Sequence, residues 1–337
     1  MTPLISILMP VHNGAAFLGE AIRSMLSQTL GDFEFLIVDD ASTDTSASIV
    51  QEFKDPRIRL IRSAERLKLS GALNLGLEHA TGRYVARMDA DDVSLPERLE
   101  IQAKFLDAHP DTGLCGSWIR MFGSSSKAVL ERPAGHEAIR AFTLLDTPFA
   151  HPTVMMRREW LEHHHLRFNG EYFPTEDFEL WTRALSCFRG ANLPQVLLLY
   201  RVHGKSLTGS DWSVMDDQAA RIIRAQLALL GIIPTAEELR FHRQLSMGRL
   251  TMTRKHLDEA ELWLNRLITA NLASHPFDHK ALEGVLGDVW FRACMHTARL
   301  GFWVSARYSD SPLAKNDSKR FERTWVIRAS ALKGKLP

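Results

Sequence analysis

FEFLIVDD, residues 33–40, is a run of mainly aromatic and aliphatic residues that ends in two aspartates. A run with so little polar alternation predicts a strand buried on both faces, as the strands of parallel sheets are. Three further apolar runs have the same character: ISILMPV (5–11), IRLI (58–61) and YVARM (84–88). We therefore expect these four runs to lie in one sheet.

Helical patterns separate the four runs. Apolar residues recur at helical spacing in FLGEAIRSMLSQ (17–28), TSASIVQEF (45–53) and SGALNLGLEHA (70–80). Strand and helix that alternate in this way predict an α/β domain with a doubly wound parallel sheet and right-handed crossovers. Ligands of such domains bind at the carboxyl ends of the strands, where the acidic residues of 39–40 and 89–92 fall.

The sequence from about Asp211 onward has helical periodicity and no further strand pattern. Thr235 and Glu238 have the spacing of a capping box, which predicts the start of a helix. We expect two domains, 1–210 and 211–337, of which the second is helical. The helices predicted for the second domain cover 213–230, 236–252, 258–273 and 277–300.

The composition is that of an ordinary globular protein. The chain has 337 residues, 45% of them hydrophobic, and a formal net charge of +1, so its overall charge does not indicate a nucleic acid partner. Its three cysteines, Cys115, Cys187 and Cys294, are far apart and indicate neither a disulfide framework nor a zinc ribbon. No stretch approaches the roughly 20 apolar residues that span a bilayer. These features fit a cytoplasmic protein.

Asp89, Asp91 and Asp92 place three carboxylates within four residues at the end of a predicted strand. Like charges repel unless water or a cation neutralises them, so the cluster is a candidate metal site. A solvated acidic turn is the alternative from these residues alone. A helix is expected just beyond the cluster, where Ser94 and Glu97 have capping-box spacing.

The same stretch, MDADDV (88–93), also fits D-x-D-x-[TV], the nucleophile loop of haloacid-dehalogenase-type phosphatases. Those enzymes place a Ser or Thr, a Lys and a second acidic pair after the nucleophile. In this sequence the other acidic pair, Asp39 and Asp40, precedes it. An EF-hand also fits poorly, because Val93 takes a ligand position and the turn lacks glycine.

Five segments in a fixed order carry a more specific pattern. Together they resemble glycosyltransferase family 2, bacterial enzymes that use nucleotide-diphospho-sugars, over about residues 3–210. The resemblance implies a GT-A fold, which is Rossmann-like with a doubly wound mixed sheet, and an inverting reaction. The segments are PVHNG (10–14), VDDASTD (38–44), ALNLGLEHATGRYVARMDADD (72–92), TEDFELW (175–181) and YRVHGKS (200–206).

The resemblance implies a nucleoside site near the ends of the first two strands. The loop of Pro10, His12 and Asn13 would pack against the nucleoside, and Asp40 would accept a hydrogen bond from the pyrimidine N3–H. A carboxylate acceptor favours uridine or thymidine nucleotides over guanine, because their bases carry an imide N–H. The alternative role for Asp40 is to cap the next helix.

The resemblance also implies a divalent metal, Mn or Mg, at the D-x-D segment. Asp91 would bind the ion directly, and Asp89 would reach the ribose or metal-bound water. His203 resembles a histidine that approaches the metal or the diphosphate in some relatives, with a purely structural histidine as the alternative. Lys68 is a candidate for phosphate contact, although its loop departs from the family pattern.

The acidic pair Glu176 and Asp177 opens a predicted helix. Asp177 matches the catalytic base of the family, and Glu176 is the first alternative. Acidic residues at a helix start are also favoured by the helix dipole alone, which is the other interpretation. His151 is expected to be a buried structural histidine, and His163 to His165 are expected to form a solvated helix end, since consecutive helical residues point in different directions.

The C-terminal residues 313–337 hold seven Lys or Arg against two acids, and Phe321, Trp325, Ala329 and Leu332 recur at helical spacing. Such a helix can dock on an anionic membrane beside a lipid-linked acceptor. The alternative is that these residues pack onto the helical region and leave an ordinary basic face.

The resemblance implies that the enzyme moves one sugar from a UDP- or dTDP-sugar to a glycan or lipid-linked acceptor, in surface polysaccharide synthesis. Processive synthases of the family carry a Q-x-x-R-W segment and membrane spans, and this sequence has neither. A catalytically silent sugar-nucleotide-binding or scaffold protein is the first alternative, and the phosphatase is the second. Peripheral contact with the inner face of a membrane is a further hypothesis.

Overall fold

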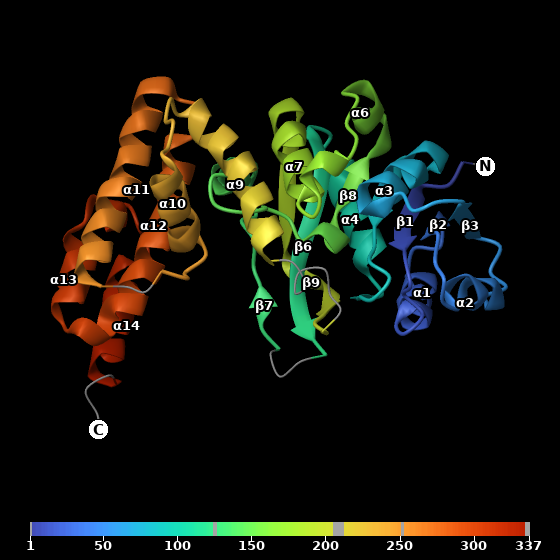
Figure 1. The fold of residues 1–337 in the computed structure, drawn as a ribbon, viewed down its shortest axis with the longest axis horizontal. Coiled ribbons are helices and arrows are strands. Elements are labelled where there is room, and N and C mark those ends of the chain that lie inside the picture. The colour runs from blue at the N-terminus through green and yellow to red at the C-terminus, as the bar shows by residue number, and fades with distance from the viewer. Residues whose placement is uncertain (1, 124–126, 205–211, 251–252, 334–337) are drawn as a thin grey trace. The chain divides into compact units, whose positions relative to one another are not determined.

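The computed structural model describes residues 2–123, 127–204, 212–250 and 253–333 (Figure 1). These residues fold into two compact units. The first unit holds the chain up to Ile139 together with Thr147–Gln218, and the second holds Arg140–Asp146 and the chain from Ala219 onward. No sequence pattern indicated that Arg140–Asp146 folds with the second unit. Whether 1–210 and 211–337 are independent domains stays a prediction.

One sheet forms the centre of the first unit, in the strand order β3-β2-β1-β4-β8-β6-β9-β5, with β7 paired to β6. The strands are β1 (Ile5–Val11), β2 (Phe33–Asp40), β3 (Ile58–Ser63), β4 (Tyr84–Arg87), β5 (Val93–Ser94), β6 (Thr112–Phe122), β7 (Val129–Leu130), β8 (Met155–Arg157) and β9 (Arg189–Arg201).

The four apolar runs of the sequence form β1 to β4, and these strands pair in parallel as predicted. The expectation of a wholly parallel sheet is wrong beyond β4, because β8 runs antiparallel to both β4 and β6. The strand β9 then pairs in parallel with β6. The sheet is therefore mixed, as the family resemblance implied.

Helices cover both faces of the sheet. Successive strand residues point to opposite faces, so Ile7 packs in one core with α1 and α4, and Leu8 packs in the other with α3 and α7. Both residues are almost fully buried, which explains why β1 has no polar alternation. The helices of the first unit are α1 (Leu18–Leu26), α2 (Ser46–Glu52), α3 (Lys68–His79), α4 (Arg98–Ala108), α6 (Arg158–His163) and α7 (Glu176–Cys187). The helix α5 (His136–Phe142) begins in the first unit and ends in the second.

The helix α4 does not begin with the predicted capping box. Its N-cap is Glu97, which makes no side-chain capping bond, and Ser94 lies in β5. The Ser94 hydroxyl instead accepts a hydrogen bond from Gln28 Nε2 at 3.2 Å. The spacing matched the motif, but the pairing of β5 with β9 holds Ser94 in an extended strand.

The second unit is helical, and a helix is present in each of the four predicted ranges. The helix predicted for 236–252 ends early, at Ser246, and residues 251–252 lie outside the described residues. The capping box of Thr235 and Glu238 is present at the start of α10. Within the described ranges, no helix is long and apolar enough to cross a membrane. The helices, shown in yellow to red in Figure 1, are α9 (Trp212–Leu229), α10 (Ala236–Ser246), α11 (Arg254–Ser274), α12 (His279–Thr297), α13 (Trp303–Asp310) and α14 (Arg320–Lys333).

A buried histidine fixes the segment Arg140–Asp146 to the second unit. His242 Nε2 donates to the Leu144 carbonyl at 2.7 Å, and His242 Nδ1 accepts from Trp263 Nε1 at 2.8 Å. Burial lowers the pKa of His242 to about 4, so the ring is neutral and can accept at one nitrogen while it donates at the other.

The close approach of α3 to β1 and β2 depends on Gly76. An added Cβ at this position would lie 2.0 Å from Leu8 Cδ1 and 3.2 Å from Val38 Cγ2. We expect Gly76→Ala to lower the free energy of unfolding by about 1–3 kcal/mol, the usual cost of overpacking a core. Urea denaturation of the full chain measures this change.

Gly19→Ala in α1 is the matched control, because its nearest neighbour, a guanidinium nitrogen of Arg23, lies at an ordinary 3.6 Å. Alanine is the better helix former, so this variant should be as stable as the parent or slightly more stable. Equal effects of the two substitutions would show that helix packing on the sheet is not what requires glycine at position 76.

Candidate active site

Three carboxylates gather just after β4. The candidate ligand oxygens of Asp89, Asp91 and Asp92 all lie within 4.8 Å of one another, and among the described residues this is the one group of His, Cys or acidic side chains that could hold a metal. Asp92 is buried, and its Oδ2 has no hydrogen-bond partner in the described chain. Burial, then Asp89 and Asp91, raise its pKa well above the usual value. These oxygens fit a divalent cation such as Mg or Mn.

Arg87, the last residue of β4, lies buried beside this cluster and forms an ion pair with Asp89. Burial would lower the pKa of Arg87, but the nearby carboxylates of Asp89, Asp92 and Asp177 raise it instead. A second buried arginine supports the first, since Arg98 Nη2 donates to the Arg87 carbonyl at 2.7 Å. Arg87 therefore provides a fixed positive charge beneath the acidic loop.

The end of β9 holds the acidic loop from the other side. The Arg201 amide donates to Asp92 Oδ1 at 2.8 Å, and Arg201 Nε donates to the Asp91 carbonyl at 2.7 Å. His203 Nε2 donates to Asp91 Oδ2 at 2.9 Å, and its ring lies 4.8 Å from that of Phe17. The structure thus brings His203 to the candidate metal ligand, more than a hundred residues away in sequence, as the metal or diphosphate hypothesis requires.

The acidic pair at the start of α7 has two different environments. Glu176 is 1% exposed, and Oε2 has no hydrogen-bond partner in the described chain. Burial, then Asp177, raises the pKa of Glu176 to about 7. Asp177 is only half-buried, and its Oδ1 accepts from the Phe178 amide at 2.7 Å. The charges of Asp89 and Asp177 both act on Arg87, so the two acidic clusters lie close together.

His151 lies in an aromatic pocket near this site. Its ring is 5.5 Å from Phe168 and 5.8 Å from Trp181, and Nε2 has no partner among the described residues. Burial, together with the charge of Arg87, holds the pKa of His151 well below its usual value. The imidazole is neutral but only half-buried, and Nε2 is unsatisfied in the described chain, so His151 is not the buried structural histidine that the sequence predicted.

At the end of β2, Asp40 is buried and its carboxylate already has partners. Oδ1 accepts from the Leu67 amide at 2.6 Å, and Oδ2 forms an ion pair with Arg66. The helix-capping alternative for Asp40 is wrong, because Asp44 accepts from the Ser46 amide at the start of α2. Arg66 is half-exposed, so a ligand can replace it at Asp40.

The segment 10–13 is tied to the loop after β2. Asn13 has a left-handed backbone, with φ of 51°, and its Oδ1 accepts from the Thr43 amide at 2.8 Å. His12 Nδ1 donates to the Asp40 carbonyl at 2.8 Å. Pro10 is not a loop residue as expected but a buried member of β1. His12 and Asn13 are exposed and remain available to a nucleoside.

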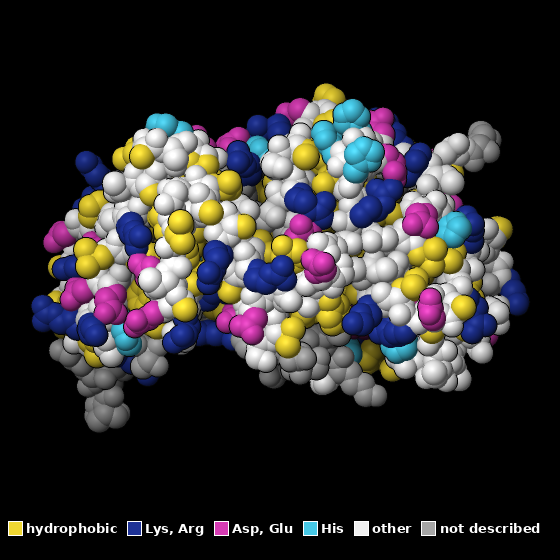
Figure 2. All heavy atoms as spheres, turned by 45° about the horizontal axis from the view of Figure 1, so that its top comes forward, with side chains coloured by type: hydrophobic (Ala, Val, Ile, Leu, Met, Phe, Trp, Pro, Cys, Tyr) yellow, Lys and Arg dark blue, Asp and Glu magenta, His cyan; other side chains and the backbone are white. Residues whose placement is uncertain are grey.

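Lys68 and the histidine run are surface features. Lys68 is the exposed first residue of α3, with a left-handed backbone of φ 60°. His163 and His165 are exposed at the end of α6, where histidine side chains gather in Figure 2. They belong to no candidate metal group among the described residues, in agreement with the expected solvated helix end.

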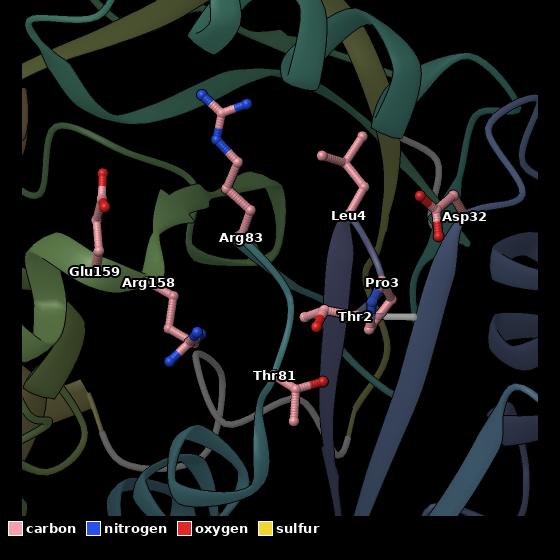
Figure 3. A pocket seen from close by; sticks show the side chains of 8 residues that line it. All are labelled: Thr2, Pro3, Leu4, Asp32, Thr81, Arg83, Arg158 and Glu159. Atoms are coloured by element: carbon pink, nitrogen blue, oxygen red, sulfur yellow. The ribbon is translucent and has the colours of Figure 1, made fainter.

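A cavity of about 380 Å³ lies away from these groups (Figure 3). It includes Leu4, before β1, and Arg83, before β4, so it is at the amino ends of the strands, opposite to the acidic clusters. Arg83 and Arg158 extend in opposite directions there, and Asp32 and Glu159 give it mixed charge. Its side chains do not converge on one point, and we assign it no chemistry.

Arg66, Arg87 and Arg201 are the site residues that sequence reasoning missed in these roles. Arg66 lies in the loop before Lys68 that departs from the family pattern, so the resemblance implies no role for it. Arg87 carried a usable signal, because a charged residue within the apolar run YVARM is costly to bury unless a specific acid pairs with it. Arg201 carried no such signal, since its contacts depend on the fold.

Comparison with known sequences finds relatives among glycosyltransferases. Residues 6–164 match the model of Glycosyl transferase family 2. The O-antigen biosynthesis glycosyltransferase WbnJ of Escherichia coli is 34% identical over 212 residues, which cover 60% of this chain and 81% of WbnJ.

Comparison with solved structures supports the same fold. TarS of S. aureus in complex with UDP-GlcNAc has a TM-score of 0.56 and 19% identity, covering 94% of this chain and 92% of that one. The mannosyltransferase PcManGT of Pyrobaculum calidifontis, in complex with GDP-Man and Mn²⁺, has a TM-score of 0.51 and 18% identity, covering 99% and 87%. The chain therefore has an α/β fold of the GT-A type, followed by a helical region.

Glu176 should make stability depend on pH. Its pKa of about 7 in the folded protein is above the 4.5 of an unperturbed glutamate. Between these values the folded protein binds more protons than the unfolded chain, so stability falls as pH rises through this window. Glu176→Gln mimics the protonated acid, so we expect the variant not to lose stability in this window. The difference in the free energy of unfolding between the two proteins should reach up to about 3 kcal/mol above pH 7.

Thermal unfolding of both proteins from pH 5 to pH 8, with a chelator present, measures the difference. The two melting temperatures should be similar at the acidic end and separate as pH rises, with the variant the more stable. Other titrating groups are common to both proteins and cancel in the difference. Parallel curves would show that Glu176 is ionised at neutral pH.

Proposed function

This chain belongs to glycosyltransferase family 2 and is a transferase enzyme, and we propose that it moves one sugar, with inversion, from a UDP- or dTDP-sugar to a glycan or lipid-linked acceptor. Two relatives support the substrate classes. WbnJ is named for O-antigen biosynthesis, and TarS was solved with UDP-GlcNAc. We further propose a role in surface polysaccharide synthesis.

The observation that carries the proposal is the division of acids around Arg87. Asp89, Asp91 and Asp92 form one cluster after β4, and Glu176 and Asp177 form another at the start of α7. Inversion needs one group on the leaving-group side of the anomeric carbon and another on the acceptor side. Two separate clusters meet this need, and a site with the D-x-D carboxylates alone would not.

Asp91 and Asp89 are the residues that would hold a divalent ion, Mn or Mg, with Asp92 beside them. When bound, the ion neutralises the charge that develops on the departing diphosphate. His203 donates to Asp91 and would orient that carboxylate or contact the diphosphate. The half-exposed Asp91 is open to ligands, whereas the buried Asp92 is held by the Arg201 amide.

Asp177 is the better placed base. The acceptor hydroxyl oxygen forms the new bond to the anomeric carbon, the bond to the diphosphate breaks with its electron pair, and the hydroxyl proton passes to Asp177. Asp177 is half-exposed, so an acceptor can reach it. Glu176 is 1% exposed, and its pKa of about 7 leaves a large protonated fraction at neutral pH. We assign Glu176 to positioning beside the base.

Asp40 would recognise the base of the nucleotide. Its Oδ2 lies in the ion pair with Arg66, and a uracil or thymine N3–H can take the place of that guanidinium. Asp40→Asn should therefore weaken UDP binding by about 10-fold or more, because an amide nitrogen would face the N3–H donor.

A thermal-shift panel of UDP-, dTDP- and GDP-sugars, with and without Mn, tests the donor class, since a ligand that binds the native state raises its melting temperature. UDP or dTDP compounds should stabilise the parent and not the Asp40→Asn variant. Asp39→Asn is the control at the same strand end, where Asp39 accepts from the Ser42 amide and pairs with Arg62. Stabilisation by GDP-sugars alone would contradict the assignment.

Asp91→Ala should abolish Mn-dependent binding of UDP while the fold stays intact, because the residue lies at a partly exposed strand end. Calorimetry with UDP, with and without Mn, measures the effect. Asp111→Ala removes a more exposed aspartate of the same unit and should leave binding unchanged. Undiminished Mn-dependent affinity in the Asp91 variant would refute its role as a ligand.

Asp177→Asn should keep Mn-dependent donor binding and lose transfer by about 10²- to 10⁴-fold, the usual contribution of a general base. Transfer and donor binding are measured on the same preparation. If the variant transfers at the parental rate, the base lies elsewhere and Glu176 is tested next. Parental transfer above a metal-free control also excludes the catalytically silent alternative. Membership of this family already argues against the phosphatase.

A further inference from the structure

The helix α14 shows an apolar stripe to solvent. Phe321, Trp325 and Leu332 are 80%, 57% and 55% exposed, and Ala329 between them is also exposed. Positions four, eight and eleven residues apart lie on one side of a helix. The helix packs onto the helical region, as one interpretation of the sequence expected, but it does so through residues other than this stripe.

The opposite side of α14 anchors the helix in the second unit. Ile327 and Ala331 are 0% and 1% exposed. Arg323 forms ion pairs with Asp288 and Asp317, which ties α14 to α12 and to the segment before α14. The helix is therefore held in place by one apolar side while a second apolar side has no cover within the described chain.

Exposed basic side chains lie before α14, at its start and beside the stripe, where Arg328 lies over the Trp325 ring at 6.0 Å. Lys315, Lys319, Arg320 and Arg328 are all exposed. Arg320 donates to the Ser309 carbonyl and Arg328 to the Ser305 hydroxyl, and neither forms an ion pair with an acid of the described residues. Asp317, one of the two acids of this region, is already paired with Arg323. The exposed Glu322 is the other acid, so basic residues outnumber acids near the stripe and the local charge is positive.

A neighbouring turn adds apolar surface. The 3₁₀ turn Ala298–Leu300 packs against α14, and Leu300 and Phe302 are 51% and 44% exposed. Single exposed apolar residues are common on proteins, but aromatic residues that recur along one side of a helix are not. The combination of exposed aromatic and aliphatic residues with nearby basic residues is typical of helices that lie at a lipid interface.

We propose that α14 docks on an anionic lipid surface, with Phe321, Trp325 and Leu332 inserted at the headgroup level and the flanking Lys and Arg side chains on lipid phosphates. Basic residues next to a membrane are attracted to anionic lipids, and salt weakens this attraction. The proposal is independent of the proposed function, because it uses no residue of the active site.

A second copy of the chain fits this stripe less well. A helix of 14 residues is about 21 Å long and about 10 Å wide, so one side offers about 200 Å². Stable protein interfaces bury about 800 Å² on each partner. Pairing two such helices would also bring together basic segments of the same sign. The small area of the stripe and the positive charge near it therefore both favour an anionic membrane over a second copy of the chain.

Flotation of the full-length protein with vesicles tests the proposal. The protein should float with vesicles that contain phosphatidylglycerol, should not float with pure phosphatidylcholine, and should be released by high salt. Replacing Phe321, Trp325 and Leu332 together by Ser should lower partitioning by about 10-fold or more. These side chains are exposed, so the thermal unfolding of the variant should match that of the parent.

The matched control replaces three exposed apolar residues elsewhere in the second unit, Ile233, Leu262 and Leu272, by Ser. This variant should float like the parent. Equal flotation of the stripe variant and the parent, or no flotation of the parent, overturns the proposal. A concentration-dependent dimer in sedimentation that only the stripe variant loses would overturn it in favour of self-association.

Discussion

The buried guanidinium of Arg87 balances the negative charge on which the site is built. It pairs with Asp89 just after β4, and it interacts electrostatically with Asp92 of the same loop and with Asp177 at the start of α7. Acids brought this close in a buried place would otherwise take up protons or separate. Arg98 holds the Arg87 carbonyl from beneath, so this positive charge has a fixed position. The two acidic clusters can then lie close together while each keeps its own proposed role, metal binding for one and base catalysis for the other.

The same neighbourhood holds many of the buried polar atoms that lack a hydrogen-bond partner in the described chain. Asp92 Oδ2, Glu176 Oε2, His151 Nε2 and Trp181 Nε1 are among them. A folded protein normally pairs such atoms, because leaving one unpaired costs about 1–3 kcal/mol. Their concentration beside Arg87 fits a site whose remaining partners are a cation, a nucleotide sugar and an acceptor. The stability lost here is recovered in the two apolar cores on either side of the sheet.

The loops that surround the site are held by contacts between distant segments. Asn13 joins the end of β1 to the loop after β2, and Arg201 joins the end of β9 to the loop after β4. A loop fixed at both ends by hydrogen bonds can hold ligands with little rearrangement. The exception is Asp40, because its proposed role in base recognition requires its ion pair with the half-exposed Arg66 to open. Nucleotide binding is therefore expected to reorder Arg66 in particular.

Local sequence patterns were enough to predict β1 to β4, the parallel pairing among them and four helices of the second unit. They were enough because a strand or helix that is buried on one or both sides has a regular spacing of apolar residues, which is visible within a short stretch of sequence. The acidic clusters and the family followed from the residues themselves. The antiparallel β8, the strand position of Ser94 and the attachment of Arg140–Asp146 to the second unit depended on long-range pairing, which no local period encodes. Tertiary structure alone decided that Asp92 is buried, that Arg87 lies near acids of two distant segments, and that the apolar stripe of α14 faces outward. Each of these features depends on which residues, distant in sequence, exclude solvent from a side chain, and this is determined only when the chain folds.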